Sequence, residues 1–166
     1  MGVPLKANIL LVDDEPDGLR GLAETLEGLQ QNLVRARSGE QALRHVLKFD
    51  FAVVVVDVGM PAMDGLETAS LIRQRKRSQQ TPIIFLASSR EDTKSIFDRF
   101  AVGTVDYVTK PFAPAQLRSK VSMFVELCHT SATPALLKVA VARDIADLIP
   151  GYMSNRQKEL EALRGR

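Results

Sequence analysis

Short apolar runs alternate with longer amphipathic stretches along the chain. The apolar runs are rich in branched residues and have the length typical of buried strands. They cover residues 8–12, 33–36, 51–56, 83–86 and 105–108. Between them, apolar residues recur every three or four positions, which is the spacing of one helix face. We therefore predict helices over residues 16–29, 39–48, 66–75, 92–100 and 114–128.

This regular alternation of strand and helix predicts an α/β fold with a parallel sheet. Right-handed crossovers between parallel strands place helices on both faces of such a sheet. Ligands bind outside the carboxyl ends of the strands, at the point where the strand order reverses. The polar residues at the predicted strand ends are Asp13 and Asp14, Asp57, Ser88 beside Ala87, and Lys110. Three acidic side chains and one lysine thus converge on the edge of the sheet where the strands have their carboxyl ends. We call this edge the rim, and the convergence predicts a binding site there.

The chemistry of this rim follows from its charges. Three carboxylates repel one another unless a cation lies among them. Aspartate side chains, a backbone carbonyl and water suit Mg²⁺, which also pairs with phosphate. A carboxylate can also act as a nucleophile and form an acyl phosphate, with Lys110 as the positive group facing the phosphoryl oxygens. An alternative role for Asp13 or Asp14 alone is to cap the N-terminus of the following helix.

Four motifs surround the predicted strand ends: ILLVDDEP, VVVVDVGMPAMDGLE, TPIIFLASS and VDYVTKPF. In order and spacing they resemble the receiver domains of two-component response regulators, over roughly residues 7–128. The resemblance implies a flavodoxin-like, doubly wound five-stranded parallel sheet in the order 2-1-3-4-5, with helices on both faces. It also implies a cis peptide bond between Lys110 and Pro111.

The resemblance assigns a role to each polar residue of the rim. Asp57 matches the phosphoacceptor of the family. Asp14 matches the direct Mg²⁺ ligand, and Asp13 the ligand that acts mainly through water. Gly59 would lend its backbone carbonyl to the metal ion, and Lys110 would pair with the phosphoryl group.

One position departs from the family pattern. Receiver domains carry Thr or Ser at the end of the fourth strand, where the hydroxyl couples the phosphoryl group to a rotating aromatic residue. Tyr107 matches that aromatic residue. An ungapped count from Pro82 places Ala87 at the hydroxyl position, and a slip of one residue would place Ser88 there. We favour Ala87, which predicts a weakened or rerouted link between phosphorylation and Tyr107.

Composition narrows the function classes. The 166 residues are 45% hydrophobic and 25% charged, and the formal net charge of +2 gives no evidence of nucleic acid binding. The single Cys128 cannot form a disulfide within the chain, which fits a reducing compartment. The chain shows no signal peptide, and its apolar runs are too short to cross a membrane. We expect a cytoplasmic protein.

The segment after the fifth predicted helix is not needed for this fold. We divide the chain into a receiver domain, residues 1–129, and a linker with a helical extension, residues 130–166. Three roles remain open for the extension. It could pack on the receiver or dimerise it, link the receiver to an output domain, or open a histidine phosphotransfer domain, which DLIPGYMSNRQKELEAL loosely resembles.

The leading hypothesis for function is a phosphoacceptor module of a His-to-Asp phosphorelay, rather than an enzyme with its own substrate. Its expected partners are a histidine kinase or histidine phosphotransfer protein, and a downstream protein or output domain, with a homodimer as a further option. The alternative is a phosphorylation-independent scaffold that keeps the receiver fold. Ala87 favours the scaffold, whereas the intact acidic rim with Lys110 argues against it.

Overall fold

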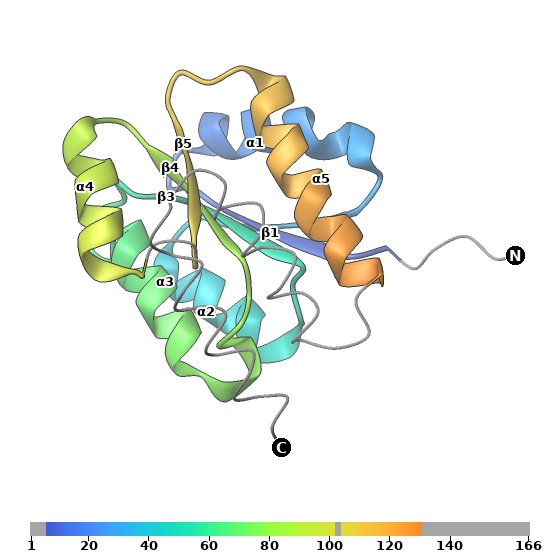
Figure 1. Cartoon of the computed structure of the whole chain (residues 1–166), viewed down its shortest axis with the longest axis horizontal. Coiled ribbons are helices and arrows are strands. Elements are labelled where there is room, and N and C mark those ends of the chain that lie inside the picture. The colour runs from blue at the N-terminus through green and yellow to red at the C-terminus, as the bar shows by residue number, and fades with distance from the viewer. Residues whose placement is uncertain (1–5, 102–103, 131–166) are drawn as a thin grey trace, which may run out of the picture.

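The structure is a computed structural model that describes residues 6–101 and 104–130 (Figure 1). Its strands are β1 (Asn8–Val12), β2 (Asn32–Ala36), β3 (Val53–Asp57), β4 (Ile83–Ala87) and β5 (Asp106–Thr109). Its helices are α1 (Pro16–Leu26), α2 (Gly39–Lys48), α3 (Gly65–Gln74), α4 (Arg90–Arg99) and α5 (Pro114–Thr130), with short 3-10 turns η1 (Glu27–Leu29) and η2 (Lys76–Ser78). Apart from Thr130, the predicted extension lies outside the described residues.

The five strands form one parallel sheet in the order β2-β1-β3-β4-β5. This order confirms the predicted fold class. The strand order reverses between β1 and β3, because β2 lies on one side of β1 and all later strands lie on the other. In doubly wound folds a ligand binds at this point, outside the carboxyl ends of the two strands. All five residues of β3 are buried, as expected for a central strand that is covered on both faces.

Successive side chains along each strand enter two different cores. Val54 and Val56 of β3 pack with residues of α2, α3 and α4, whereas Val53 and Val55 pack with residues of α1 and α5. Figure 1 shows the same division, with α1 and α5 on one side of the sheet and the other three helices opposite. Each fully buried aliphatic side chain contributes roughly 1.5–3 kcal/mol to folding, so the two cores fix the strand ends firmly.

Several element boundaries differ from the sequence prediction by one to three residues, and two of these differences have identifiable reasons. Strand β3 includes Asp57, because the residues of its carboxyl end continue the ladder as far as the pair formed by Asp57 and Leu86. Helix α4 begins at Arg90 rather than residue 92, because the Ser89 hydroxyl accepts a hydrogen bond from the backbone N–H of Asp92 and caps the helix there. Neither difference moves a predicted site residue away from the rim.

No helix within residues 6–101 and 104–130 has both the length and the apolar character needed to cross a bilayer.

Candidate functional site

Three carboxylates meet at the carboxyl ends of β1 and β3. Asp13 and Asp14 directly follow β1, and Asp57 is the last residue of β3. One oxygen from each of the three carboxylates lies within 4.8 Å of the others. Asp13 and Asp57 are buried, with only 3% and 6% of their surface exposed, while Asp14 is half-buried. Pairing of β1 with β3 therefore concentrates negative charge in a place that water screens poorly.

The protonation of the Asp13 carboxylate depends on its burial and on the charges around it. Burial, and after it the charges of Asp57 and Asp14, raise the pKa of Asp13 above its ordinary value of 3.8. The backbone N–H of Glu15, which donates to Asp13 Oδ1 at 3.0 Å, and the charge of Lys110 act in the opposite direction. Glu15, and neither Asp13 nor Asp14, occupies the N-cap position of α1. The capping alternative is therefore wrong.

Asp13→Asn is expected to stabilise the protein in the absence of divalent cations. The folded protein holds the Asp13 proton more tightly than the unfolded chain does, so stability contributed by this group is lost as pH rises through the raised pKa. At pH 7 the variant should therefore melt a few degrees higher in EDTA, and the gain should shrink as pH falls through that pKa. Thermal unfolding followed by circular dichroism measures both effects, and a lower midpoint for the variant at pH 7 contradicts the prediction.

Lys110 supplies the positive charge opposite the acidic group. It follows β5 directly, and its Nζ donates a hydrogen bond to Asp57 Oδ2 at 2.7 Å. Burial lowers the pKa of Lys110, but the hydrogen bond and charge of Asp57 outweigh it and leave that pKa raised. The backbone N–H of Lys110 also donates to the carbonyl of Ala87 at 2.7 Å, which ties the lysine to the end of β4. The Lys110–Pro111 peptide bond is cis, as the resemblance implies.

The loop after β3 folds back tightly against Asp57. The backbone N–H of Gly59 donates to Asp57 Oδ1 at 3.1 Å, and that of Gly65 donates to the carbonyl of Val58 at 3.0 Å. Asp64 then caps α3 through a 2.8 Å hydrogen bond from the backbone N–H of Glu67. Gly65 approaches so closely that a Cβ atom there would lie 2.2 Å from the carbonyl oxygen of Asp57. Nothing in the sequence around Gly65 reveals this approach to the backbone of Asp57, so the sequence alone assigns Gly65 no role.

The donor set fits a small divalent cation. Three carboxylates from two adjacent strands lie close enough to share one ion, and the excess negative charge is only partly balanced by Lys110. Exposed Gly59, two residues beyond Asp57, carries no side chain that would occupy the space beside the carboxylates. Carboxylate and carbonyl oxygens bind hard cations such as Mg²⁺ well, whereas softer metals prefer sulfur ligands.

Two of the predicted switch residues, Ala87 and Tyr107, belong to the core between the sheet and helices α2, α3 and α4. Ala87 is fully buried, and Tyr107 packs against the core cluster to which Ala87 belongs. The half-buried Tyr107 ring meets the edge of Phe97 from α4, with a distance of 5.7 Å between ring centroids. Ser88 lies outside β4 and is exposed, and its backbone N–H donates to Asp92 at 2.8 Å. The methyl group of Ala87, and not the Ser88 hydroxyl, therefore shares a core with Tyr107.

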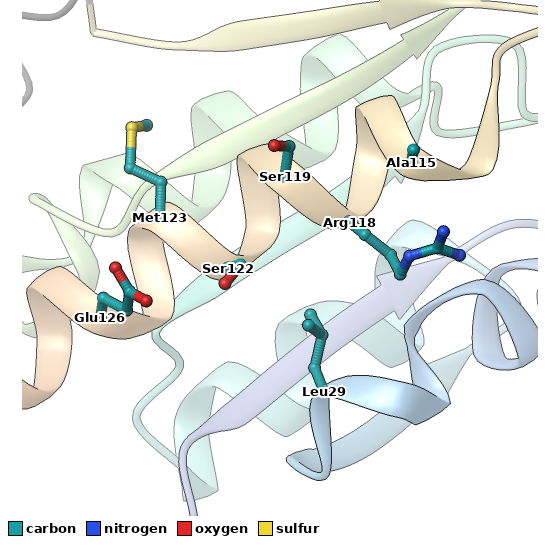
Figure 2. A pocket seen from close by; sticks show the side chains of 7 residues that line it. All are labelled: Leu29, Ala115, Arg118, Ser119, Ser122, Met123 and Glu126. Carbon is teal, nitrogen blue, oxygen red and sulfur yellow. The ribbon is translucent and has the colours of Figure 1, made fainter.

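Two surface hollows differ in their position relative to the acidic rim. One of about 430 Å³ adjoins it and has polar walls, formed by Asp14, Arg37, Ser38, Glu40, Gln41 and Arg44. A second, of about 480 Å³, lies between the turn after α1 and the outer face of α5 (Figure 2). It is lined by Leu29, Ala115, Arg118, Ser119, Ser122, Met123 and Glu126. None of the predicted site residues borders this second hollow.

Comparison with known proteins agrees with this geometry. The family model of the response regulator receiver domain matches residues 9–122. The transcriptional regulatory protein SrrA of Staphylococcus aureus is 32% identical over 139 residues, which are 84% of this chain and 55% of SrrA. The chain thus spans about half the length of the curated relatives it matches.

Solved structures show the same fold. The chemotaxis protein CheY4 of Vibrio cholerae is 30% identical with a TM-score of 0.63, over 72% of this chain and 98% of that one. A second structure is the receiver domain of a sensor histidine kinase from Pseudomonas aeruginosa, which holds a magnesium ion in its active-site cleft. It is 24% identical with a TM-score of 0.66, over 73% of this chain and 98% of that one. With the acidic rim, the strand order and the family match together, the chain belongs to the response regulator receiver domain family.

Proposed function

We propose that this receiver domain accepts a phosphoryl group on Asp57 as a signalling module of a two-component phosphorelay. The observation that carries the proposal is the pairing of Lys110 Nζ with Asp57 Oδ2 at 2.7 Å, beside two further carboxylates. Hydrogen bonds hold both carboxylate oxygens of Asp57, Oδ2 from Lys110 and Oδ1 from the backbone N–H of Gly59, and each oxygen keeps a further lone pair for attack. The ammonium group of Lys110 is already in place for the incoming negative charge. A merely structural ion pair would not need Asp13 and Asp14 next to it.

Mg²⁺ is the proposed cofactor. Asp14 and Asp57 would hold the ion directly, Asp13 through water, and Gly59 through its backbone carbonyl. When bound, Mg²⁺ neutralises the phosphoryl oxygens and so lowers the repulsion between the donor and the acidic rim. The magnesium ion in the related Pseudomonas receiver supports this assignment.

The chain's own residues carry the transfer. An Asp57 carboxylate oxygen attacks phosphorus in a phosphohistidine donor, an O–P bond forms, and the P–N bond breaks with the electron pair leaving on the histidine nitrogen. Lys110 then stays beside the new phosphoryl group and balances its charge. Water later attacks phosphorus, the bond between phosphorus and the Asp57 oxygen breaks, and inorganic phosphate leaves, which restores the free carboxylate. The protein thus carries a phosphoryl group for a time and turns over no substrate of its own.

Intact-mass measurement tests the proposal. The full chain is incubated with acetyl phosphate in Mg²⁺ and, separately, in EDTA. We expect a gain of one phosphoryl group in Mg²⁺ that decays on standing, and no gain in EDTA. An unchanged mass with acetyl phosphate and also with a phosphorylated histidine kinase would overturn it.

The expected partners follow from the same chemistry. The donor would be a histidine kinase or a histidine phosphotransfer protein in the cytoplasm. The output would be a change in contacts on the face formed by α4, β5 and α5, read by a downstream protein, an output domain or a second copy. The transcriptional regulator SrrA, which is longer than this chain, is one example of a relative with further sequence beyond the receiver.

A phosphorylation-independent scaffold is the second candidate function, and Ala87 is the observation that favours it. A hydroxyl at this position would donate a hydrogen bond to a phosphoryl oxygen, whereas the buried methyl group of Ala87 cannot. In the scaffold, phosphoryl uptake would have no effect on the α4-β5-α5 face.

The response of Tyr107 to a phosphoryl mimic separates the two functions. With beryllofluoride and Mg²⁺, we expect amide signals near Asp57 and Lys110 to shift while the Tyr107 ring keeps its contact with Phe97. Ala87→Thr should make the ring signals respond, and Ser88→Ala should change nothing. Nuclear magnetic resonance of the ring protons measures this, and full inward rotation of Tyr107 in the wild-type protein would show that the hydroxyl is dispensable.

A further inference from the structure

Gly18 occupies an unusual place in the first turns of α1. Glycine inside a helix costs conformational entropy relative to alanine, so its presence there calls for a physical reason. A Cβ atom at this position would lie 2.2 Å from Asp13 Oδ2, 2.8 Å from its Cγ and 3.2 Å from its Oδ1. The Asp13 carboxylate therefore occupies the space that any other side chain at position 18 would need.

We propose that Gly18 is a positioning residue for the Asp13 carboxylate and thereby for the divalent cation site. The inference rests on the proposed function, since it concerns the same acidic rim. Gly18 would touch neither the cation nor the phosphoryl group, and it acts only by leaving room for Asp13.

The surroundings of Asp13 leave the carboxylate few alternatives. It is 97% buried, and its Oδ1 is held by the backbone N–H of Glu15 at 3.0 Å. The three closest atoms to the missing Cβ all belong to the Asp13 side chain and none to the backbone. The atoms that would first obstruct a side chain at position 18 therefore all belong to Asp13.

Gly21, one turn further along α1, provides the contrast. A Cβ atom at Gly21 would meet nothing within 4 Å. Helix α1 therefore has no general need for glycine, and the requirement is specific to the position that faces Asp13.

Alanine at position 18 must displace either the carboxylate or the helix by roughly 1 Å, because a Cβ contact of 2.2 Å is far inside van der Waals distance. Either movement breaks the hydrogen bond from Glu15 or shifts Asp13 relative to Asp14 and Asp57. Mg²⁺ demands near-octahedral geometry and tolerates such displacement poorly. We expect the Mg²⁺ affinity of Gly18→Ala to fall about tenfold.

Isothermal titration calorimetry of the full chain with Mg²⁺ measures this directly. Gly21→Ala is the matched control, because it makes the same chemical change in the same helix and should bind Mg²⁺ as the wild type does. If Gly18→Ala binds Mg²⁺ as tightly as Gly21→Ala, the positioning role is refuted. Absence of Mg²⁺ binding by the wild-type chain would instead refute the proposed function, so the two failures are distinguishable.

A double-mutant cycle keeps the test decisive even where Gly18→Ala unfolds part of the protein. Asp13→Ala removes the three atoms that lie nearest to the new Cβ. Gly18→Ala should therefore lower the thermal midpoint in the wild-type background and raise it in the Asp13→Ala background, as Gly21→Ala does in both. Equal losses in the two backgrounds would show that Gly18 acts on something other than Asp13.

Discussion

Asp57→Asn is expected to abolish phosphoryl uptake completely. The asparagine amide has nearly the same shape as the carboxylate, but it is a poor nucleophile and forms no acyl phosphate. Its side-chain oxygen can still accept the hydrogen bond that Lys110 donates at 2.7 Å, so the fold around the site should persist. The substitution therefore removes the reaction and leaves the scaffold.

Intact mass after incubation with acetyl phosphate and Mg²⁺ measures the loss. The matched control is Asp98→Asn, which makes the same change at an exposed position of α4 and should gain one phosphoryl group like the wild type. Circular dichroism should give similar spectra for all three proteins. A phosphoryl group that persists on Asp57→Asn would show that another residue, such as Asp13 or Asp14, is the acceptor.

Gly65→Ala is expected to cause the largest loss of stability among these substitutions, at least about 3 kcal/mol in the free energy of unfolding. Its Cβ atom would lie 2.2 Å from the backbone oxygen of Asp57, 2.8 Å from the backbone carbon and 2.9 Å from Val58 Cα. Backbone atoms of a central buried strand cannot move aside as a flexible side chain can. The start of α3 would have to separate from β3, and the hydrogen bond from Gly65 to Val58 would be lost.

Urea unfolding measures this loss. Gly59→Ala is the control, since its Cβ atom would approach nothing more closely than 4.0 Å, at Asp57 Oδ1. That variant should unfold at nearly the wild-type urea concentration. A Gly65→Ala protein as stable as Gly59→Ala would mean that the loop after β3 relaxes more easily than its hydrogen bonds indicate.

The sequence determined the elements of this protein and the chemistry of its rim. Apolar runs of strand length alternating with helical periodicity predict the α/β sheet that the structure shows, because burial on two faces leaves few other arrangements. Helix α2 begins and ends as predicted, with Ser38 capping it through a hydrogen bond from the backbone N–H of Gln41. Polar residues directly after apolar runs, such as Asp57 and Lys110, predicted the candidate site because parallel strands bring their carboxyl ends to one edge.

Only the tertiary structure decided which side chain shares a core with Tyr107 and which glycines have no room for a Cβ atom. Ala87 and Ser88 are adjacent in sequence, yet the structure places Ala87 in the core against which Tyr107 packs and leaves Ser88 exposed after the end of β4. Gly18 and Gly21 look equivalent along the chain, and only one of them has a carboxylate against it. The sequence shows only that glycine has no side chain, whereas the packing of segments far apart in the sequence decides which atoms occupy the space beside it.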